Sequence, residues 1–142
     1  MMLTAQGADH TVGNAATFKC DDKNVEELVA ESLRMQINAA VADSLGLCVF
    51  GRSVTDENLE LIANAINDAF DAGVTPDFIR NIGFETLRLE AAFNNAAGFG
   101  EDDDELPAFF LEEPLPPTGK MARLYSREVN AAMQNLMEAQ SL

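Results

Sequence analysis

The side chains best suited to bind or transform another molecule are few in this chain. They are two cysteines, Cys20 and Cys48, and a single histidine, His10. A thiolate binds soft metal ions, and an imidazole exchanges protons near neutral pH. The two cysteines form no C-x-x-C pair and are too few for a disulfide framework, which is typical of a reducing compartment. Without further context, Cys48 is interpreted as a buried thiol that packs as a small hydrophobe.

Carboxylates offer a second kind of chemistry. The acidic run at residues 101–105 has the ligand type that calcium prefers, but it lacks the alternating oxygen ligands, central glycine and distal glutamate of an EF-hand loop. We therefore interpret it as a solvated turn. Asp43 differs from these acids because it lies near the end of a predicted helix, where the helix dipole disfavours negative charge.

Helices have to position these residues, because strand signals are almost absent. Asn24 followed by Glu27 is typical of a helix N-cap with a reciprocal acidic partner, and apolar residues then recur at helical spacing. We predict a long helix over residues 24–44 that stops at Gly46. Residues 48–50 are the one run predicted to be extended in the manner of a strand.

Two more helices are predicted in the middle of the chain. Thr55 caps the first, which ends at Gly73, and Thr75 followed by Pro76 begins the second, which ends at Gly98. The predicted buried face of the first consists of Leu59, Ile62, Ala63, Ile66, Ala69 and Phe70. The predicted buried face of the second consists of Phe78, Ile82, Leu89 and Phe93.

The rest of the chain is predicted to be less regular. Prolines make residues 99–119 extended or turning, with one helical turn around residues 108–111. Ser126 is the predicted cap of a last helix that runs to about Ala139. The core side of that helix consists of Val129, Met133, Leu136 and Met137. Residues 1–23 are predicted to form an irregular leading segment before one helical domain at 24–142. The predicted fold is all-α, with about four helices.

Composition excludes several classes of protein. The 142 residues suit one domain, and the net charge of -15 with scattered lysines and arginines disfavours binding to nucleic acid. No apolar run reaches the roughly 20 residues that span a bilayer. The N-terminus shows no basic leader followed by an apolar stretch, so a cytoplasmic location is expected.

The hexapeptide Asp43-Ser44-Leu45-Gly46-Leu47-Cys48, at the end of the predicted long helix, resembles a D-x-x-G-L-C motif. That motif belongs to the tungsten-containing aldehyde ferredoxin oxidoreductases. Residues 89–99 resemble the family's E-R-x-F-N-x-R-x-G-F pattern, and residues 102–115 resemble its D-D-x-L-P and E-E-P-L patterns. Order, spacing and residue types agree over more than half the chain. The chain is therefore identified as similar to the C-terminal helical domain of this family.

The resemblance implies that these helices belong to a much longer enzyme. Such an enzyme oxidises aldehydes to carboxylic acids at a tungsten or molybdenum bis-pterin, and a 4Fe-4S cluster passes the electrons to ferredoxin. A β-rich N-terminal domain and a clustered cysteine motif would lie outside this chain, which has only two of the thiolates that a cluster requires. We therefore expect the isolated chain to be inactive and to hold no cofactor.

The resemblance also implies roles for individual residues. Asp43 would accept hydrogen bonds from the pterin, and Gly46 and Leu47 would bring backbone N–H and C=O groups close to the ring. Cys48 would be the fourth ligand of the cluster. Family members carry a histidine near the substrate pocket, similar in placement to His10, which implies proton transfer or substrate orientation by His10.

Two positions depart from the family pattern. Ala91 and Ala96 stand where the pattern has arginines, so the ion pairs of those arginines are absent. Two alternatives therefore stay open: a separately encoded helical subunit that completes a larger partner, or a cofactor-free interaction domain derived from the family. Core surface left uncovered in the isolated piece predicts self-association into a homo-oligomer.

Overall fold

The computed structural model describes residues 3–7, 9–15 and 18–140. Its long helices are α1 (Val25–Ser44), α3 (Leu59–Phe70), α4 (Pro76–Ala97) and α6 (Ser126–Gln140). The short elements are η1 (Val49–Gly51), α2 (Arg52–Thr55), η2 (Glu101–Asp104) and α5 (Phe109–Glu112). Within the described residues no strand forms, so the all-α prediction is confirmed. None of the described helices is both long enough and apolar enough to cross a membrane.

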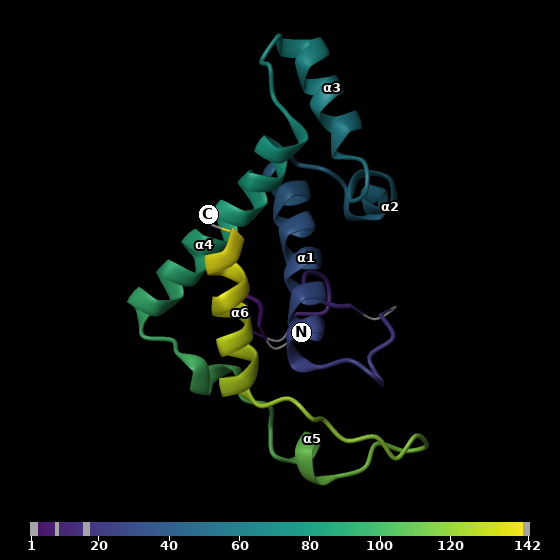
Figure 1. Ribbon diagram of the computed structural model, residues 1–142, viewed down its shortest axis with the longest axis vertical. Helices are drawn as coiled ribbons and strands as arrows, with labels where there is room; N and C mark the ends of the chain where they lie inside the picture. Colours follow the sequence, from purple (N-terminus) through teal and green to yellow (C-terminus); the bar gives the residue numbers. More distant parts are fainter. Residues whose placement is uncertain (1–2, 8, 16–17, 141–142) are drawn as a thin grey trace.

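Helix α1 is the centre of the molecule, and it packs against both α4 and α6 (Figure 1). Helix α3 extends beyond one end of α1, while α5 and its flanking loops lie at the opposite end. The apolar core forms three clusters along α1. They consist of Val41, Leu59, Ile62, Ala63 and Ile79; of Val29, Val129 and Ala132; and of Leu33, Ile37 and Phe84. Every cluster contains residues of α1, so this helix positions all the others.

Helices α1 and α4 approach closely at Gly83, which is buried on α4. A Cβ atom at this position would lie 2.4 Å from the carbonyl oxygen of Ile37 and 2.8 Å from Cγ2 of Val41. Real Cβ atoms do not tolerate such distances, so only glycine allows the two helices to pack at this separation. The crossing fixes where the C-terminal half of α4 lies relative to the end of α1.

Local sequence signals set the ends of α1 and α4 as predicted. The Asn24 side chain accepts a hydrogen bond from the Glu27 backbone N–H (2.9 Å), and the Glu27 carboxylate accepts one from the Asn24 N–H (3.1 Å). Thr75 caps α4 through the N–H of Phe78 (3.2 Å). Gly98 ends α4 in the left-handed conformation, with φ 93°.

Three predictions around α3 need correction. Thr55 is the last residue of α2 rather than a cap, because α3 begins later and Asn58 accepts the hydrogen bond from the N–H of Leu61. An ion pair between Arg52 and Asp56, at 3.1 Å, stabilises α2 as a separate turn. Of residues 48–50 only Cys48 has an extended backbone, since Val49–Gly51 forms a 3-10 helix. The left-handed residue that closes α3 is Asp71, with φ 50°, and not Gly73.

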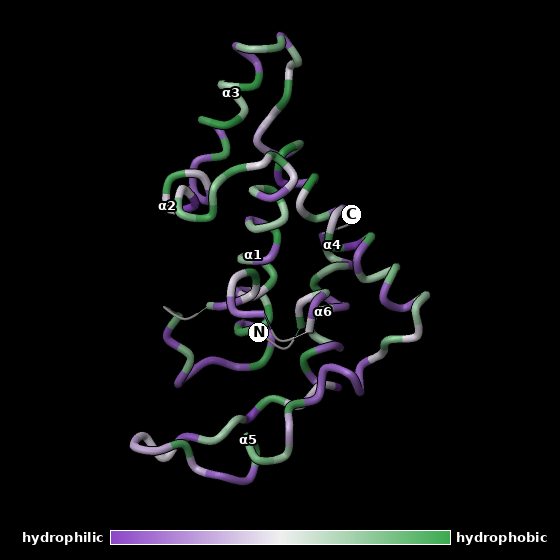
Figure 2. Tube along the Cα trace, turned by 180° about the vertical axis from the view of Figure 1, so that it is seen from behind, coloured by the Kyte–Doolittle hydropathy of each residue, from purple (hydrophilic) through white to green (hydrophobic). Residues whose placement is uncertain are grey.

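The predicted buried face of α4 is also wrong. Exposure is 55% for Phe78, 62% for Leu89 and 72% for Phe93, and Ile82 is half-buried. Helix α1 covers the neighbouring face instead, because that face carries Gly83 and permits close approach. Ala69 and Phe70 of α3 are exposed as well. Apolar positions along α3, seen in green at the far end of the molecule from α5 (Figure 2), are therefore only partly covered.

The acidic run at residues 101–105 is attached to α6 rather than simply solvated. The Glu105 carboxylate accepts hydrogen bonds from the backbone N–H (3.0 Å) and the hydroxyl (2.7 Å) of Ser126, the first residue of α6. Asp104 accepts a hydrogen bond from Asn130 at 3.0 Å. Negative charge is favourable at this end of a helix, because the helix dipole is positive there. The run is therefore an exposed turn, as interpreted, whose residues Asp104 and Glu105 also bond to α6.

We expect Glu105→Gln to lower the thermal midpoint at neutral pH. The hydrogen bonds from Ser126 lower the pKa of Glu105 below its ordinary value of 4.5, so the folded state favours the ionised carboxylate. The stabilisation is present above pH 4.5 and is lost as the pH falls through the lower folded pKa. Thermal scans from pH 7 to pH 3 should therefore show the difference from wild type shrinking in acid.

The matched control is Asp102→Asn, because the Asp102 side chain in the same run bonds to no described residue. That variant should follow wild type at every pH. A midpoint difference for Glu105→Gln that stays constant across the range would contradict the assigned contact.

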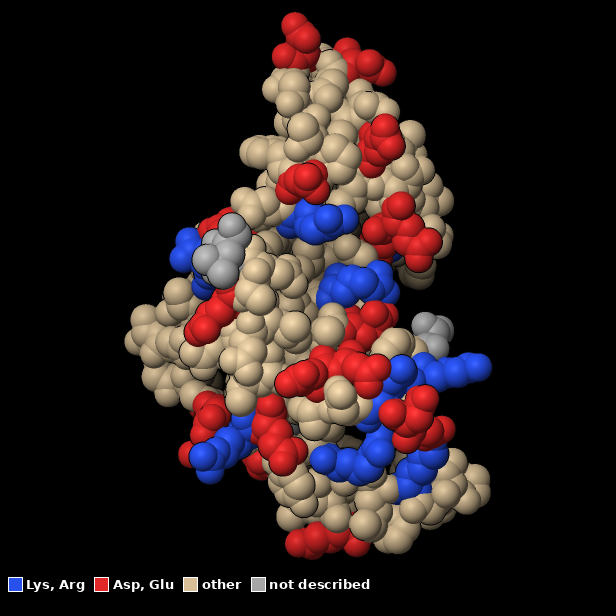
Figure 3. Space-filling view, viewed as in Figure 1, with Lys and Arg blue, Asp and Glu red and all other residues tan. Residues whose placement is uncertain are grey.

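Surface charge agrees with the excess of acidic residues. Acidic side chains extend over the whole length of the face in Figure 3, and its Lys and Arg side chains lie beside acidic ones. Several of these neighbours are ion pairs, such as Lys23 with Glu27 (3.0 Å) and Arg34 with Glu31 (2.7 Å). This face therefore offers no basic patch of the kind that binds a phosphate backbone.

Candidate functional site

The turn at the end of α1 carries four of the predicted site residues. Gly46 is left-handed, with φ 66°, and its N–H donates to the carbonyl of Asp43 at 3.1 Å. The N–H of Leu47 donates to the carbonyl of Ala42 at 2.8 Å, which completes a Schellman motif. Both N–H groups are thus engaged within the chain. The carbonyl oxygens of Gly46 and Leu47 accept no hydrogen bond from a described residue, so these are the groups that remain available to a ligand.

Packing determines which residues of this turn reach solvent. Leu45 and Leu47 both contact the core cluster between α1, α3 and α4. The residue after Leu47 therefore lies outside the core, and Cys48 is an exposed free thiol. The interpretation of Cys48 as a buried, hydrophobe-like thiol is wrong. An exposed thiol beside a fixed turn can bind a metal group that approaches from outside the chain.

The two cysteines cannot serve one metal group together. Cys20 lies just before the first residue of α1 and Cys48 just after its last turn, and a helix of 20 residues is about 30 Å long. The Cys20 carbonyl accepts a hydrogen bond from Arg123 at 3.1 Å, close to the ion pair of Asp21 with Lys120. Among the described residues, no group of three or more His, Cys, Asp and Glu side chains is placed to hold a metal ion.

Asp43 borders a recess of about 100 Å³ between α1, α4 and the N-terminal segment. Its carboxylate accepts no hydrogen bond from any described residue, and it is exposed. The recess is lined by Thr4, Ala5, Gln6, Asp9, Val12, Gln36, Ala40, Asp43, Ser44, Thr86, Leu87 and Glu90. Carboxylates from three segments meet there, and the lining contains no Lys or Arg. The recess therefore suits a group that presents N–H donors.

The negative charges that line the recess destabilise the folded chain when no ligand is bound. Partial burial raises the pKa of Glu90 above 4.5, and the negative charge of Asp43 raises it further. Asp43 also lies in the last turn of α1, where the dipole is negative. Two unfavourable interactions at one residue, with no compensating bond in the described chain, are typical of a functional position.

Replacing Asp43 should therefore stabilise the isolated chain. We expect Asp43→Asn to raise the free energy of unfolding by about 0.5 kcal/mol, because it removes a charge from the negative end of α1. It should also lower the pKa of Glu90, since the charge of Asp43 raises that pKa. Urea unfolding and a carbon-detected NMR titration measure the two effects.

The control is Asp68→Asn, on α3 and outside the recess, which should leave the pKa of Glu90 unchanged. If Asp43→Asn destabilised the chain and left that pKa unchanged, Asp43 would be a structural residue.

His10 lies on the N-terminal loop that borders the same recess through Asp9. The Asp9 carboxylate accepts hydrogen bonds from the backbone N–H (2.6 Å) and hydroxyl (2.7 Å) of Thr11, and these lower the pKa of Asp9 below 3.8. The carbonyl of Thr11 accepts a hydrogen bond from Arg52 at 3.3 Å. The imidazole of His10 is exposed and bonds to no described residue. The structure thus brings the His10 loop close to the Asp43 recess.

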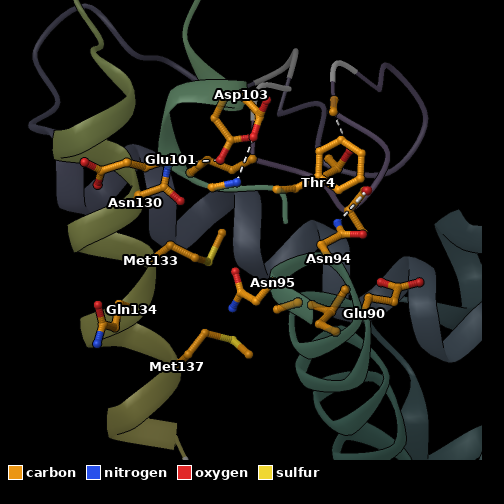
Figure 4. Close-up of a pocket in the computed structure, with 18 of the residues that line it drawn as sticks. Thr4, Glu90, Asn94, Asn95, Glu101, Asp103, Asn130, Met133, Gln134 and Met137 are labelled. Carbon is orange, nitrogen blue, oxygen red and sulfur yellow. Dashed lines mark hydrogen bonds between the residues drawn. The ribbon is translucent and has the colours of Figure 1, made fainter. Parts of the chain in front are cut away.

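A larger open groove of about 1070 Å³ adjoins the recess between α4, α6 and η2. Asn94 and Asn95 of α4 lie across it from Met133 and Met137 of α6 (Figure 4). Asn94 also donates a hydrogen bond to the carbonyl of Ala5 at 2.9 Å, which closes one end of the groove. None of the five predicted site residues lines the groove, so we place the candidate site at the recess and the adjoining 43–48 turn.

Sequence reasoning gave no role to two residues of this site. Glu90 stands in the segment that resembles E-R-x-F-N, so a signal was present, but only the fold shows that it shares a recess with Asp43. Arg52 follows Cys48 closely and has no motif around it. Its contacts with the Thr11 and Met35 carbonyls could not be found without the structure.

Comparison with known proteins agrees with the motifs. The sequence model described as aldehyde ferredoxin oxidoreductase, domains 2 & 3, matches residues 1–139. This match includes the N-terminal loop, the 43–48 turn, and nearly all of the helical chain. No curated protein and no solved structure gives a significant match.

Proposed function

Because this chain belongs to the aldehyde ferredoxin oxidoreductase family, we propose that it is the C-terminal helical portion of a cytoplasmic oxidoreductase. The complete enzyme oxidises aldehydes to carboxylic acids at a tungsten or molybdenum bis-pterin, with a 4Fe-4S cluster and ferredoxin as electron acceptors. Domains 2 and 3 of such an enzyme require its other domains as partners. On its own, this chain is inactive.

The observation that carries the proposal is the carboxylate of Asp43, which is exposed and has no hydrogen-bond partner among the described residues. It borders a recess without cations, at a helix end that disfavours it, and it accepts no hydrogen bond from the described chain. A pterin presents an amino group and ring N–H groups, which are the donors that a carboxylate binds. The free carbonyl oxygens of Gly46 and Leu47 lie beside it and accept the same kind of donor. The acceptor oxygens of this turn therefore fit the N–H donors on a pterin edge.

Cys48 fits a role as one ligand of the cluster. Its thiol is exposed and follows directly on the pterin-binding turn, while Cys20 lies at the other end of α1. A cluster of this type needs four thiolates, so the other three come from the remainder of the enzyme. When bound, the metal pterin carries out the oxidation and the cluster passes electrons onward. This chain supplies the ligands that orient them.

We assign His10 to proton transfer or substrate orientation. An imidazole exchanges protons near neutral pH, and the imidazole of His10 is exposed. On either side of it in sequence, Asp9 lines the recess and the Thr11 carbonyl accepts a hydrogen bond from Arg52. The ionised carboxylate of Asp9 precedes His10 in the chain.

Uncovered apolar surface supports an incomplete assembly. On α4, Phe78, Leu89 and Phe93 are exposed, and next to Cys48 the side chain of Phe50 is 93% exposed. Monomeric proteins rarely leave this much aromatic surface open to water. The remainder of the enzyme covers these faces in our proposal, and the isolated chain self-associates, which sedimentation across concentrations would detect.

One observation favours the cofactor-free alternative. Ala91 and Ala96 are exposed where the family pattern has arginines, so this chain lacks charged contacts that the pattern includes. A cofactor-free interaction domain or a separately encoded subunit would tolerate that loss. Both alternatives predict a native chain of this size.

The proposal is tested by the cofactor content of the native enzyme. Purified with Asp43→Asn, it should lose most of its pterin and its tungsten or molybdenum, while Asp68→Asn leaves both unchanged. Full pterin and metal content in the Asp43 variant would refute the assigned role.

A further inference from the structure

Arg52 connects three segments that are distant in sequence. Its guanidinium donates from Nη1 to the carbonyl of Thr11 and from Nη2 to the carbonyl of Met35, each at 3.3 Å. Nε and Nη2 also contact the carboxylate of Asp56, the shortest N–O distance being 3.1 Å. The acceptors therefore come from the His10 loop, from the middle of α1 and from the turn after α2.

The ion pair in this arrangement is partly buried, whereas the contact with the Thr11 carbonyl lies at the surface. The side chain of Arg52 is 12% exposed and that of Asp56 is 16% exposed. A planar guanidinium has five fixed N–H donors, so it can bind several acceptors at once and hold their relative orientation. Lysine has a single ammonium group and cannot reproduce that geometry. The contact with Asp56 lies within one helical turn, whereas the two carbonyl contacts join Arg52 to segments distant in sequence.

The segment between Cys48 and Arg52 is short and internally bonded. The N–H of Gly51 donates to the carbonyl of Cys48 at 2.9 Å, and the N–H of Arg52 donates to the carbonyl of Val49. The backbone of Cys48 is thus joined to Arg52 through one 3-10 turn. On its other side, Arg52 binds the residue that follows His10. The guanidinium is the described side chain that joins these two predicted functional segments.

We propose that Arg52 is a positioning residue that fixes the His10 loop relative to the Cys48 turn. Through this contact, the imidazole stays at a defined place beside the recess of Asp43. The inference rests on the proposed function in that it takes His10 and Cys48 to be functional residues. The geometric part does not depend on any cofactor.

Dipolar electron paramagnetic resonance on the 142-residue chain measures the geometry directly. Spin labels are attached to Cys48 and to a cysteine introduced by His10→Cys, in a Cys20→Ser background. Both labelled side chains are exposed and bond to no described residue, so the labels disturb little. We expect Arg52→Gln to broaden the distance distribution about twofold, with helicity by circular dichroism unchanged. Hydrogen exchange at residues 11–13 should rise about tenfold.

The matched control is Arg34→Gln, which removes an arginine of α1 that forms its ion pair with Glu31 and makes no described hydrogen bond to the His10 loop. It should leave the distribution narrow. A narrow distribution in Arg52→Gln, equal to that of the control, would overturn the proposal. If Arg52→Gln fails to fold, Arg52→Lys replaces it, because Lys retains the charge opposite Asp56 but loses the planar set of donors. That variant should still broaden the distribution, and an unbroadened one would also overturn the proposal.

A second measurement separates this inference from the proposed function. In the complete enzyme, Arg52→Gln and His10→Gln should each lower kcat, and the double variant should lose no more than His10→Gln alone. Iron and pterin contents should stay at wild-type levels, since Arg52 binds neither. Independent, additive losses would show that Arg52 does not act through His10. If His10→Gln had no effect while the distance distribution still broadened, the catalytic role of His10 would fail and the positioning by Arg52 would stand.

Discussion

Gly83→Ala should be the most destabilising of the single substitutions considered, with a loss of about 3 kcal/mol in the free energy of unfolding. Alanine is intrinsically better than glycine inside a helix by about 1 kcal/mol, so propensity alone predicts a gain. A steric clash turns this expected gain in the free energy of unfolding into a loss. The new Cβ would lie 2.4 Å from the carbonyl oxygen of Ile37, and a backbone oxygen in the middle of α1 cannot move aside. The two helices would have to separate, which opens the core around Ile79 and Phe84.

Gly51→Ala is the matched control for this substitution. Gly51 has φ -87°, which alanine adopts readily, and no atom lies within 4 Å of an added Cβ. Urea unfolding should show little change or a small gain for this variant. Equal stabilities for Gly83→Ala and wild type would mean that α1 and α4 do not pack at the described distance.

Cys48→Ser should remove most of the cluster from the complete enzyme. Serine offers a hard oxygen in place of a soft thiolate, so the 4Fe-4S cluster would lose one of its thiolate ligands. Iron content and the cluster's electron paramagnetic resonance signal should both fall severalfold. The isolated chain should unfold at the wild-type urea concentration, because the Cys48 thiol is exposed and bonds to no described residue.

Cys20→Ser serves as the control, since Cys20 lies at the other end of α1 and contributes only its backbone carbonyl to a described contact. Its iron content should equal that of wild type. A Cys48→Ser enzyme with full iron content would show that Cys48 is not a ligand.

Local signals predicted the helices well because the interactions that begin and end a helix involve neighbours in sequence. The reciprocal bonds of Asn24 and Glu27 and the cap at Thr75 need no tertiary information. Thr55 was misjudged because Asn58 is a competing cap three residues later, and the Arg52–Asp56 pair favours the separate turn. Where two caps compete, distant contacts decide between them.

The covered face of α4 could not be predicted from periodicity. This helix carries apolar residues on two adjacent faces, and larger side chains occupy the face with Phe78, Leu89 and Phe93. The face that packs on α1 contains Gly83, which contributes no apolar area to a pattern. The close approach that Gly83 permits therefore decides which face of α4 is buried, and the size of the apolar side chains does not. The face with the larger side chains stays exposed, in keeping with the proposal that the chain is one part of a larger enzyme.

The candidate site was partly predictable. The 43–48 turn follows from sequence because Gly46 is the left-handed residue that a Schellman motif requires. Its neighbours do not follow, since Glu90 and the His10 loop reach it through the packing of α4 and through Arg52. Roles for His10, Asp43, Gly46, Leu47 and Cys48 stay predictions, as does the division into a leading segment at 1–23 and a helical domain at 24–142.

The central claim is that this chain is one piece of a complete oxidoreductase, and the size of the native polypeptide tests it most directly. An antibody raised against residues 99–119, an exposed and proline-rich segment, identifies the polypeptide in an immunoblot of source-cell extract. We predict a band several times heavier than 15.4 kDa, in a protein that contains tungsten or molybdenum and iron. A band at 15.4 kDa, in a species without these metals, would contradict the claim and favour the cofactor-free domain.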